Sequence, residues 1–154
     1  MGVWELLGFG VTALVGTLLH FLYDWTGSSL WVSPFSGVNE STWEHMKLLF
    51  FPMFAYAVVQ SFFFGGRKDF WCVKLKGVIV GLALIPVLFY TYNGVIGKSP
   101  DWINISIFFI SAAIAYLFET RQFNKENRSC KYPKAAFVVL CVIAVAFVAF
   151  TFIT

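Results

Sequence analysis

Long apolar runs alternate with short polar connections along the whole chain. The runs cover about residues 3–23, 43–64, 77–96, 102–118 and 135–153. Each has roughly the 17–25 residues that an α-helix needs to cross ~30 Å of hydrocarbon. The pattern therefore predicts an all-α fold, in which residues 1–154 form one domain, an integral membrane bundle of five transmembrane helices.

The composition supports a lipid environment. Hydrophobic residues make up 59% of the chain and charged residues 12%, whereas a soluble domain carries about 25% charged residues. A soluble domain of this size has too much surface to hide so much apolar area. The aromatic content of 20% suits an exterior in contact with lipid. We expect a multi-pass protein of the cell membrane, with membrane lipid as its partner.

Basic residues gather in two of the connections, and this distribution predicts an orientation. The other two connections, residues 24–40 and 97–101, contain a single basic residue, Lys98. Because basic loops stay in the cytoplasm, we predict a cytoplasmic amino terminus and an extracytoplasmic carboxyl terminus. The basic connections hold Arg67, Lys68, Lys74 and Lys76 in the first case, and Arg121, Lys125, Arg128, Lys131 and Lys134 in the second.

The net charge of +3 does not indicate a nucleic-acid partner. Asp69 and Glu126 interrupt the basic residues, so no extended basic stripe is available to follow phosphates. We therefore expect no nucleic-acid binding.

Two further features concern packing. Cys72, Cys130 and Cys141 form no CxxC or Cys/His motif, so we expect them to pack as small apolar side chains. Gly77 and Gly81 form a GxxxG pair, which predicts close approach of the third span to a neighbouring helix.

The polar residues concentrate between His20 and Lys47. His20 and Asp24 are four residues apart and share a helix face. Ser41 followed by Glu44 is typical of a capping box, which predicts a helix start near Ser41. This places His20 and His45 at the extracytoplasmic ends of adjacent helices. Tyr92 and Asn93, at the same end of the third span, are candidates for the wall of a pocket there.

Three interpretations of this segment remain open. In the first, His20, Asp24 and His45 bind a divalent metal such as zinc, and Glu40 or Glu44 is the general base for hydrolysis of a lipid or headgroup. Imidazole and carboxylate are suitable ligands, although the chain contains no HExxH motif.

The second interpretation is a metal-free polar network, in which Glu44 caps a helix and His45 pairs with Asp24 or a backbone carbonyl. The third is a route for ions or small solutes. Polar residues inside the spans are few, and so small a monomer has little room for a pore, so transport would call for a homo-oligomer. The more polar span residues are Glu5, Gln60, Tyr90 and Asn104, with Glu119 beside Arg121.

The same segment carries a resemblance. The block Asn39-Glu40-Ser41-Thr42-Trp43-Glu44-His45 resembles a family of small bacterial multi-span membrane proteins of unknown function. The resemblance implies a bacterial inner-membrane location and no particular chemistry. A more distant similarity is to ceramidase-like membrane hydrolases, whose zinc is held by several histidines and an acid. This chain has two histidines and no His-x-x-x-His pair, so one chain cannot form a three-histidine zinc site.

Overall fold

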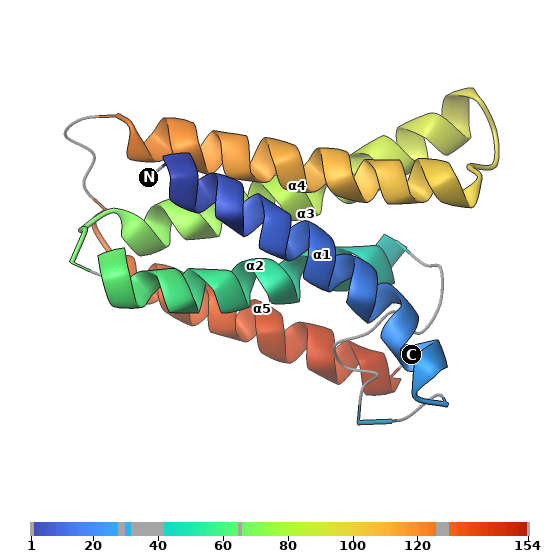
Figure 1. Cartoon of the computed structure of the whole chain (residues 1–154), viewed down its shortest axis with the longest axis horizontal. Coiled ribbons are helices and arrows are strands. Elements are labelled where there is room, and N and C mark those ends of the chain that lie inside the picture. Colours follow the sequence, from blue (N-terminus) through green and yellow to red (C-terminus); the bar gives the residue numbers. More distant parts are fainter. Residues whose placement is uncertain (1, 28–29, 32–41, 65, 126–129, 154) are drawn as a thin grey trace.

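The computed structural model describes residues 2–27, 30–31, 42–64, 66–125 and 130–153. Five α-helices occupy these ranges, and each is long and apolar enough to cross a membrane. The predicted all-α architecture is therefore confirmed at this level. The helices, shown in Figure 1, are α1 (Gly2–Trp25), α2 (Thr42–Phe64), α3 (Phe70–Val95), α4 (Asp101–Phe123) and α5 (Pro133–Ile153).

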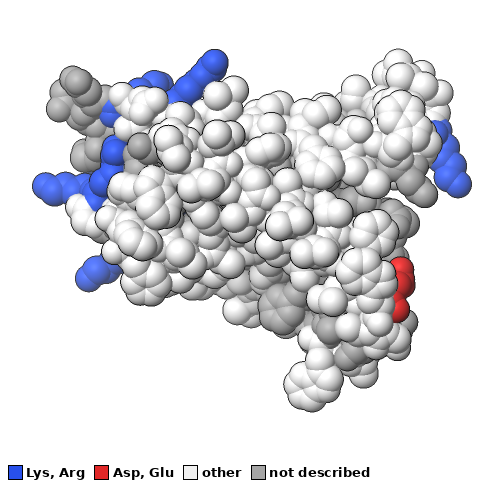
Figure 2. Space-filling view, viewed as in Figure 1, with Lys and Arg blue, Asp and Glu red and all other residues white. Residues whose placement is uncertain are grey.

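Successive helices run up and down the bundle, so the connections alternate between its two ends (Figure 1). The amino terminus and the α2–α3 and α4–α5 connections share one end, which we call the basic end. Most of the Lys and Arg side chains visible in Figure 2 gather there. The opposite end holds the α3–α4 connection and the carboxyl terminus. The two basic connections thus share one end, as the alternation of loop charges predicts.

Helix α1 carries its polar and small residues inward and its apolar residues outward. Glu5, Gly8, Thr12 and Gly16 recur every three or four residues and are all buried. Such a face lets neighbouring helices approach closely, while an apolar exterior is what lipid accepts. The large apolar side chains exposed on α1 include Val3, Leu6, Leu7, Val11, Leu14 and Leu18.

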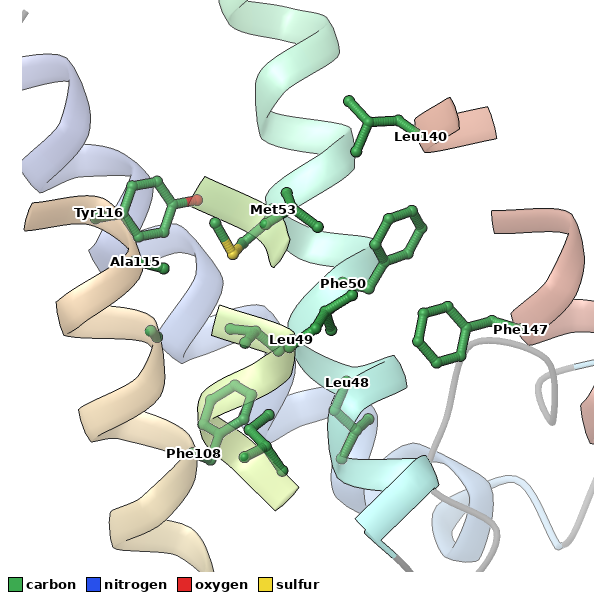
Figure 3. Close-up of a cluster of buried hydrophobic side chains, with 13 residues drawn as sticks. Leu48, Leu49, Phe50, Met53, Phe108, Ala115, Tyr116, Leu140 and Phe147 are labelled. Carbon is green, nitrogen blue, oxygen red and sulfur yellow. The ribbon is translucent and has the colours of Figure 1, made fainter. Parts of the chain in front are cut away.

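The apolar core is centred on α2, whose side chains reach helices on both sides (Figure 3). Phe50 packs against Phe147 of α5, with the ring centroids 5.3 Å apart. Leu49 is also fully buried and packs in the same cluster as Phe108 and Ala115 of α4. The same core includes Val78, Leu82 and Ile85 of α3, so it joins α2 to α3, α4 and α5.

Glycines bring α3 and α4 together. A β-carbon on Gly81 would meet Leu49 and the β-carbon of Ala115, and one on Gly77 would overlap the carboxyl group of Glu119. The close approach predicted from the GxxxG pair is therefore confirmed, and the neighbouring helix is α4.

Two helices extend further toward the basic end than the hydropathy pattern predicts. Helix α3 begins at Phe70 rather than near residue 77, and α4 continues to Phe123 rather than ending near residue 118. Charged residues in these extra turns, Lys74 and Glu119, reduced the apparent hydropathy there. Both side chains are nevertheless buried inside the bundle.

The expectation for the cysteines was wrong for two of them. Cys72, in the first turn of α3, forms a disulfide with Cys130, which precedes α5. Their Cα atoms are 5.9 Å apart, within the usual range for a disulfide. The two residues meet because the first turn of α3 and the residue before α5 both lie at the basic end. Cys141 lies within α5 as a free, partly buried thiol.

Candidate functional site

The side chain of Lys74 lies between two carboxyl groups inside the bundle. Its Nζ is 3.1 and 3.2 Å from the two carboxyl oxygens of Glu5 on α1. It is also 2.8 Å from Oε2 of Glu119 on α4. No more than 2% of any of these three side chains is exposed. An ion-pair arrangement so fully removed from solvent is costly unless every charge is matched.

Gln60 brings α2 into the same arrangement. Its Nε2 donates a hydrogen bond of 2.9 Å to Oε1 of Glu5. We call Glu5, Gln60, Lys74 and Glu119 the Lys74 cluster. Each lies about one helical turn, roughly 5 Å along the axis, inside the basic end of its helix. Four helices therefore contribute one polar side chain each at the same level of the bundle.

Aromatic rings surround the ammonium group of Lys74. The rings of Tyr56, Phe70, Tyr116 and Phe123 have centroids 6.0, 5.7, 5.7 and 5.6 Å from Nζ. Ring faces attract cations, most strongly where water is excluded. The rings thus help to stabilise a buried cation and separate the Lys74 cluster from its surroundings.

The charges in the cluster do not balance when both carboxyl groups are ionised. Among the described residues it contains two carboxyl groups and one ammonium group. Oε1 of Gln60 is buried without a hydrogen-bond partner in the described part of the chain, whereas the carboxyl group of Glu119 hydrogen-bonds to that of Glu5. An ionised carboxylate only accepts hydrogen bonds, so this contact needs a proton on one of the two groups. A proton would also balance the charge of the cluster, as would a bound cation.

Further polar contacts continue from the cluster along the inner face of α1. The hydroxyl groups of Thr12 and Tyr116 are hydrogen-bonded at 2.7 Å in the buried interior. The hydroxyl of Tyr56 donates to the backbone carbonyl of Trp4 at 2.6 Å. Polar side chains thus follow α1 from its first turn to its middle.

A groove of about 450 Å³ lies between α1 and α4 near the basic end. Glu5 of the Lys74 cluster forms part of its inner wall. Most of its remaining lining is apolar, although Tyr116 and Thr120 add hydroxyl groups. The described lining residues are Gly2, Glu5, Leu6, Phe9, Ala113, Tyr116, Leu117 and Thr120.

The predicted histidine pair lies toward the opposite end of the bundle. The imidazole rings of His20 on α1 and His45 on α2 have centroids 5.9 Å apart. Both rings line a cavity of about 70 Å³ whose other walls are largely apolar, including Phe108. The sequence therefore identified two residues that the fold brings together.

The acids predicted to accompany the histidines are placed differently. Asp24 is exposed near the end of α1. The carboxyl group of Glu44 is 2.6 Å from Nζ of Lys47, which also donates a hydrogen bond of 3.1 Å to Thr151 of α5. Glu40, like the proposed cap Ser41, lies outside the described residues. Glu44 therefore belongs to a buried ion pair that faces α5.

Tyr92 and Asn93 lie near the end of α3, where Asn93 holds the α3–α4 connection. The side chain of Asn93 accepts a hydrogen bond from the backbone N–H of Ser99 and donates to the Ser99 hydroxyl. That hydroxyl donates in turn to Asn104 at 2.7 Å. Asn104, rather than Tyr92 or Asn93, lines a second small cavity beside His45.

No group of three His, Cys, Asp or Glu side chains is placed to share a metal ion within the ranges that the structure describes. Of the predicted ligands His20, Asp24 and His45, only the two histidines lie close together in the described structure. Any third ligand would have to come from a rearrangement or from residues outside those ranges.

The contacts of the Lys74 cluster were not predicted from the sequence. The sequence pattern marks Glu5, Gln60 and Glu119 as separate polar residues of the spans and puts Lys74 in a basic connection. The available signal was positional. All four residues lie about one turn from helix ends that up-and-down topology places together. Residues at the same height in neighbouring helices are predicted to be in contact, even when they are far apart in the chain.

Comparison with known proteins identifies the family of the chain but indicates no activity. Among curated proteins and among solved structures, none matches the chain. A family model, in contrast, matches residues 1–154 and so extends far beyond the Asn39–His45 block. The chain therefore belongs to the family of unknown function DUF6512.

Proposed function

We propose that the chain inserts in the bacterial inner membrane with five spans and acts as a proton-dependent transporter of a small cation. The Lys74 cluster is its ion-binding site. The observation that carries this proposal is the pairing of one buried ammonium group with two buried carboxyl groups. Ionisable groups inside spans are costly, and they often belong to proton or ion pathways.

The uneven charge supplies the mechanism. With both carboxyl groups ionised, the cluster has a net negative charge in a site from which water is excluded. A proton on Glu5 or Glu119 removes that charge and provides a hydrogen-bond donor. A bound cation removes the same charge, so proton and cation exclude each other electrostatically. Mutually exclusive binding at one site is what couples two fluxes.

The rest of the bundle suits this role. The inner face of α1 is polar or small from Glu5 to Gly16, and the His20–His45 pair lies further along the same helix. In the described structure, the rings of Tyr116 and Phe108 lie against Gly8 and Gly16. Movement of these rings would be required to connect the two ends. A homo-oligomer is the expected transporting unit.

The orientation follows the loop charges. The basic end faces the cytoplasm, and the carboxyl terminus lies outside the cell. In this orientation the Lys74 cluster is close to the cytoplasmic surface and the histidine pair is close to the outer one. The exposed apolar side chains of α1 then face lipid or another copy of the chain.

Proton-coupled flux can be measured in proteoliposomes that contain a pH-sensitive dye. Sodium, potassium, ammonium and methylammonium are added outside in turn, with the membrane potential clamped. We expect at least one cation to change the lumenal pH faster than in protein-free liposomes, and Glu119→Gln to abolish the change. Rates equal to those of empty liposomes for all four cations would overturn the proposal.

Glu44→Gln is the matched control. Glu44 is also a buried carboxyl group paired with a lysine, but it lies toward the opposite end in a pair with Lys47. The variant should retain wild-type flux. Loss of flux in Glu44→Gln and Glu119→Gln alike would mean that any broken ion pair disables the bundle, and the special role of the Lys74 cluster would be rejected.

A second candidate function rests on the proximity of His20 and His45. Here the two imidazoles bind zinc or another divalent metal, Asp24 or Glu40 completes the site, and Glu40 or Glu44 acts as base for hydrolysis of a lipid or headgroup. Glu44 would first have to separate from Lys47. Metal analysis of the purified protein tests this function. Stoichiometric metal lost in both His20→Ala and His45→Ala supports it, and metal content unchanged by either substitution rejects it.

A further inference from the structure

We propose that the groove between α1 and α4 holds one acyl chain of an anionic phospholipid, and that Arg121, near the basic end of α4, binds the phosphate of that lipid. The proposal goes beyond transport and does not rest on it. It depends on three features of the described structure, which are the side on which the groove opens, the hydrogen bonding of its wall and the basic side chain beyond it.

The groove opens on the side of the bundle, where a membrane lipid can enter it. Two of its lining side chains, Leu6 of α1 and Leu117 of α4, are 70% and 52% exposed. Ala113, one turn before Leu117, is exposed as well. Apolar side chains exposed along transmembrane helices face lipid tails, which are as apolar as they are. An acyl chain therefore reaches the groove from the bilayer without passing through the bundle.

The polar side chains in the described wall of the groove already have hydrogen-bond partners inside the bundle. Glu5 accepts hydrogen bonds from Lys74. The hydroxyl of Tyr116 is bonded to that of Thr12, and Thr120 donates to the backbone carbonyl of Tyr116. A polar solute in the groove would lose its hydration and find few new partners, which is costly. The wall therefore favours an apolar occupant, although three of its residues are polar.

The groove positions a lipid but does not by itself choose among lipids. Its volume of about 450 Å³ is within the ~300–1,000 Å³ typical of small-molecule sites, and apolar side chains from both helices supply most of its walls. An acyl chain that moves from the bilayer into the groove gains packing contacts and no hydrophobic transfer energy, because both surroundings are apolar. Selectivity between lipids must therefore come from the headgroup.

Arg121 is placed to bind that headgroup. It lies four residues beyond Leu117 toward the basic end of α4, so the two residues share a helix face. Its side chain is exposed and forms no ion pair within the described ranges. Arg67, at the same end, is paired with Asp69 instead. A guanidinium group binds phosphate oxygens through two parallel N–H groups, so Arg121 suits a lipid phosphate.

The charge around Arg121 favours a headgroup with a net negative charge. Lys125 is exposed just beyond the end of α4, and Figure 2 shows other Lys and Arg side chains at the basic end. The choline or ethanolamine group of a zwitterionic lipid would add a further positive charge there. A phospholipid without such a group adds only its negative phosphate. Basic residues near a membrane surface attract anionic lipids for this reason.

Native mass spectrometry of the delipidated protein in detergent tests the proposal. The protein is titrated with phosphatidylglycerol and with phosphatidylcholine that carry the same two oleoyl chains. We expect one saturable phosphatidylglycerol per chain, and affinity about tenfold lower both for phosphatidylcholine and for phosphatidylglycerol on Arg121→Gln, the effect of losing a charge-assisted hydrogen bond. Equal affinity for the two lipids, or unchanged affinity in Arg121→Gln, would overturn the proposal.

Lys134→Gln is the matched control for the charge. Lys134 is an exposed basic residue at the start of α5, and α5 packs against neither α1 nor α4 in the described structure. The variant should bind phosphatidylglycerol as the wild type does. An equal loss of affinity in Lys134→Gln and Arg121→Gln would attribute the effect to the total charge of the basic end and reject the site at Arg121.

Two alanine variants test the groove. Ala113 is exposed in its lining, so Ala113→Trp should fill the groove and prevent saturable binding of phosphatidylglycerol. Ala83 is exposed on α3 and is not among the described lining residues, so Ala83→Trp should bind normally. Glycerol 3-phosphate, which has the phosphate without acyl chains, should not displace the lipid. Equal binding by the two variants, or displacement by glycerol 3-phosphate, would reject the acyl-chain site.

The same spectra distinguish the lipid from a second copy of the chain. A dimer that forms without lipid and is lost in Ala113→Trp would assign the groove to the second copy and overturn the proposal, whereas lipid bound to the monomer supports it. The result is separate from the flux assay. Saturable phosphatidylglycerol binding without cation-driven flux would retain the lipid site and reject transport.

Discussion

Gly77 of α3 lies against the carboxyl group of Glu119 of α4, so closely that a β-carbon on Gly77 would overlap Oε1, Cδ and Cγ of Glu119. Both residues are buried in full-length helices. The absence of a side chain at Gly77 therefore leaves the space in which Glu119 reaches Lys74. The small size of Gly77 thus determines where the carboxyl group of Glu119 lies.

Gly77→Ala should accordingly displace Glu119 from Lys74. We expect the variant to lose thermal stability in detergent, because a displaced buried carboxyl group loses its charge-assisted hydrogen bond, and to lose flux as Glu119→Gln does. Gly10→Ala is the control, since a β-carbon at that exposed helical position meets no neighbouring atom. A Gly77→Ala protein with wild-type stability and flux would contradict the described packing.

Removal of the ammonium group should be more damaging than removal of a carboxylate. Lys74→Met leaves two buried carboxyl groups without their shared partner, and breaking such a pair costs about 3–5 kcal/mol. We expect folded protein to be recovered in low yield from membranes. The double variant Lys74→Met/Glu119→Gln, with one buried charge fewer, should recover part of the loss.

Lys76→Met is the matched control for this experiment. Lys76 lies on the same helix but is exposed, and its removal should leave the yield and thermal stability within the range of the wild type. Size-exclusion chromatography in detergent gives the yield of folded protein. Equal loss in Lys74→Met and Lys76→Met would show that the basic end tolerates no loss of positive charge, independently of the cluster.

Hydropathy was sufficient to predict the number of described helices because lipid-facing surface dominates the composition of each span. It was misleading where a helix buries charge. Lys74 and Glu119 lowered the apparent hydropathy of two helix ends, so these turns were assigned to connections. The two charges stabilise each other only in the folded bundle. A linear pattern cannot represent a pairing between residues 45 positions apart.

The proximity of His20 and His45 could be predicted from the sequence, whereas the ion pair of Glu44 was not. Spacing within one helix and the ends of adjacent helices place His20 near His45, and the structure describes that pair. The pairing of Glu44 with Lys47 is local, because the two residues are three positions apart on α2 and such neighbours share a helix face. This spacing was the available sequence signal for the pair. Membership of a family of unknown function is confirmed over the whole chain.

The Thr12–Tyr116 hydrogen bond offers a quantitative test of the interior. Hydrogen bonds between membrane helices contribute ~0.6 kcal/mol on average, with a maximum near ~1.7 kcal/mol. We expect Thr12→Val and Tyr116→Phe each to lower the free energy of unfolding by about this amount. Because both remove the same bond, the double variant should lose less than the sum. Strict additivity in a double-mutant cycle would show that the hydroxyl groups do not interact.

The Cys72–Cys130 pair provides a test of orientation. The disulfide joins the first turn of α3, at the basic end, to Cys130. Loop charge predicts that this end faces the cytoplasm, where thiols are normally kept reduced. We therefore expect both thiols to be reduced in intact cells and to form the disulfide on extraction into air. Cells are treated with a membrane-permeant alkylating agent before lysis, and the number of modified cysteines is counted by mass spectrometry.

A Cys141→Ser background removes the remaining free thiol, so each modified cysteine then belongs to the pair. Two modified cysteines per chain are expected if the basic end is cytoplasmic, because both thiols react before air can oxidise them. Complete protection from alkylation, reversed by adding a reductant to the cells, would mean that the disulfide exists in an oxidising compartment. In that case the loop-charge orientation is inverted, and the Lys74 cluster lies close to the outer surface of the membrane.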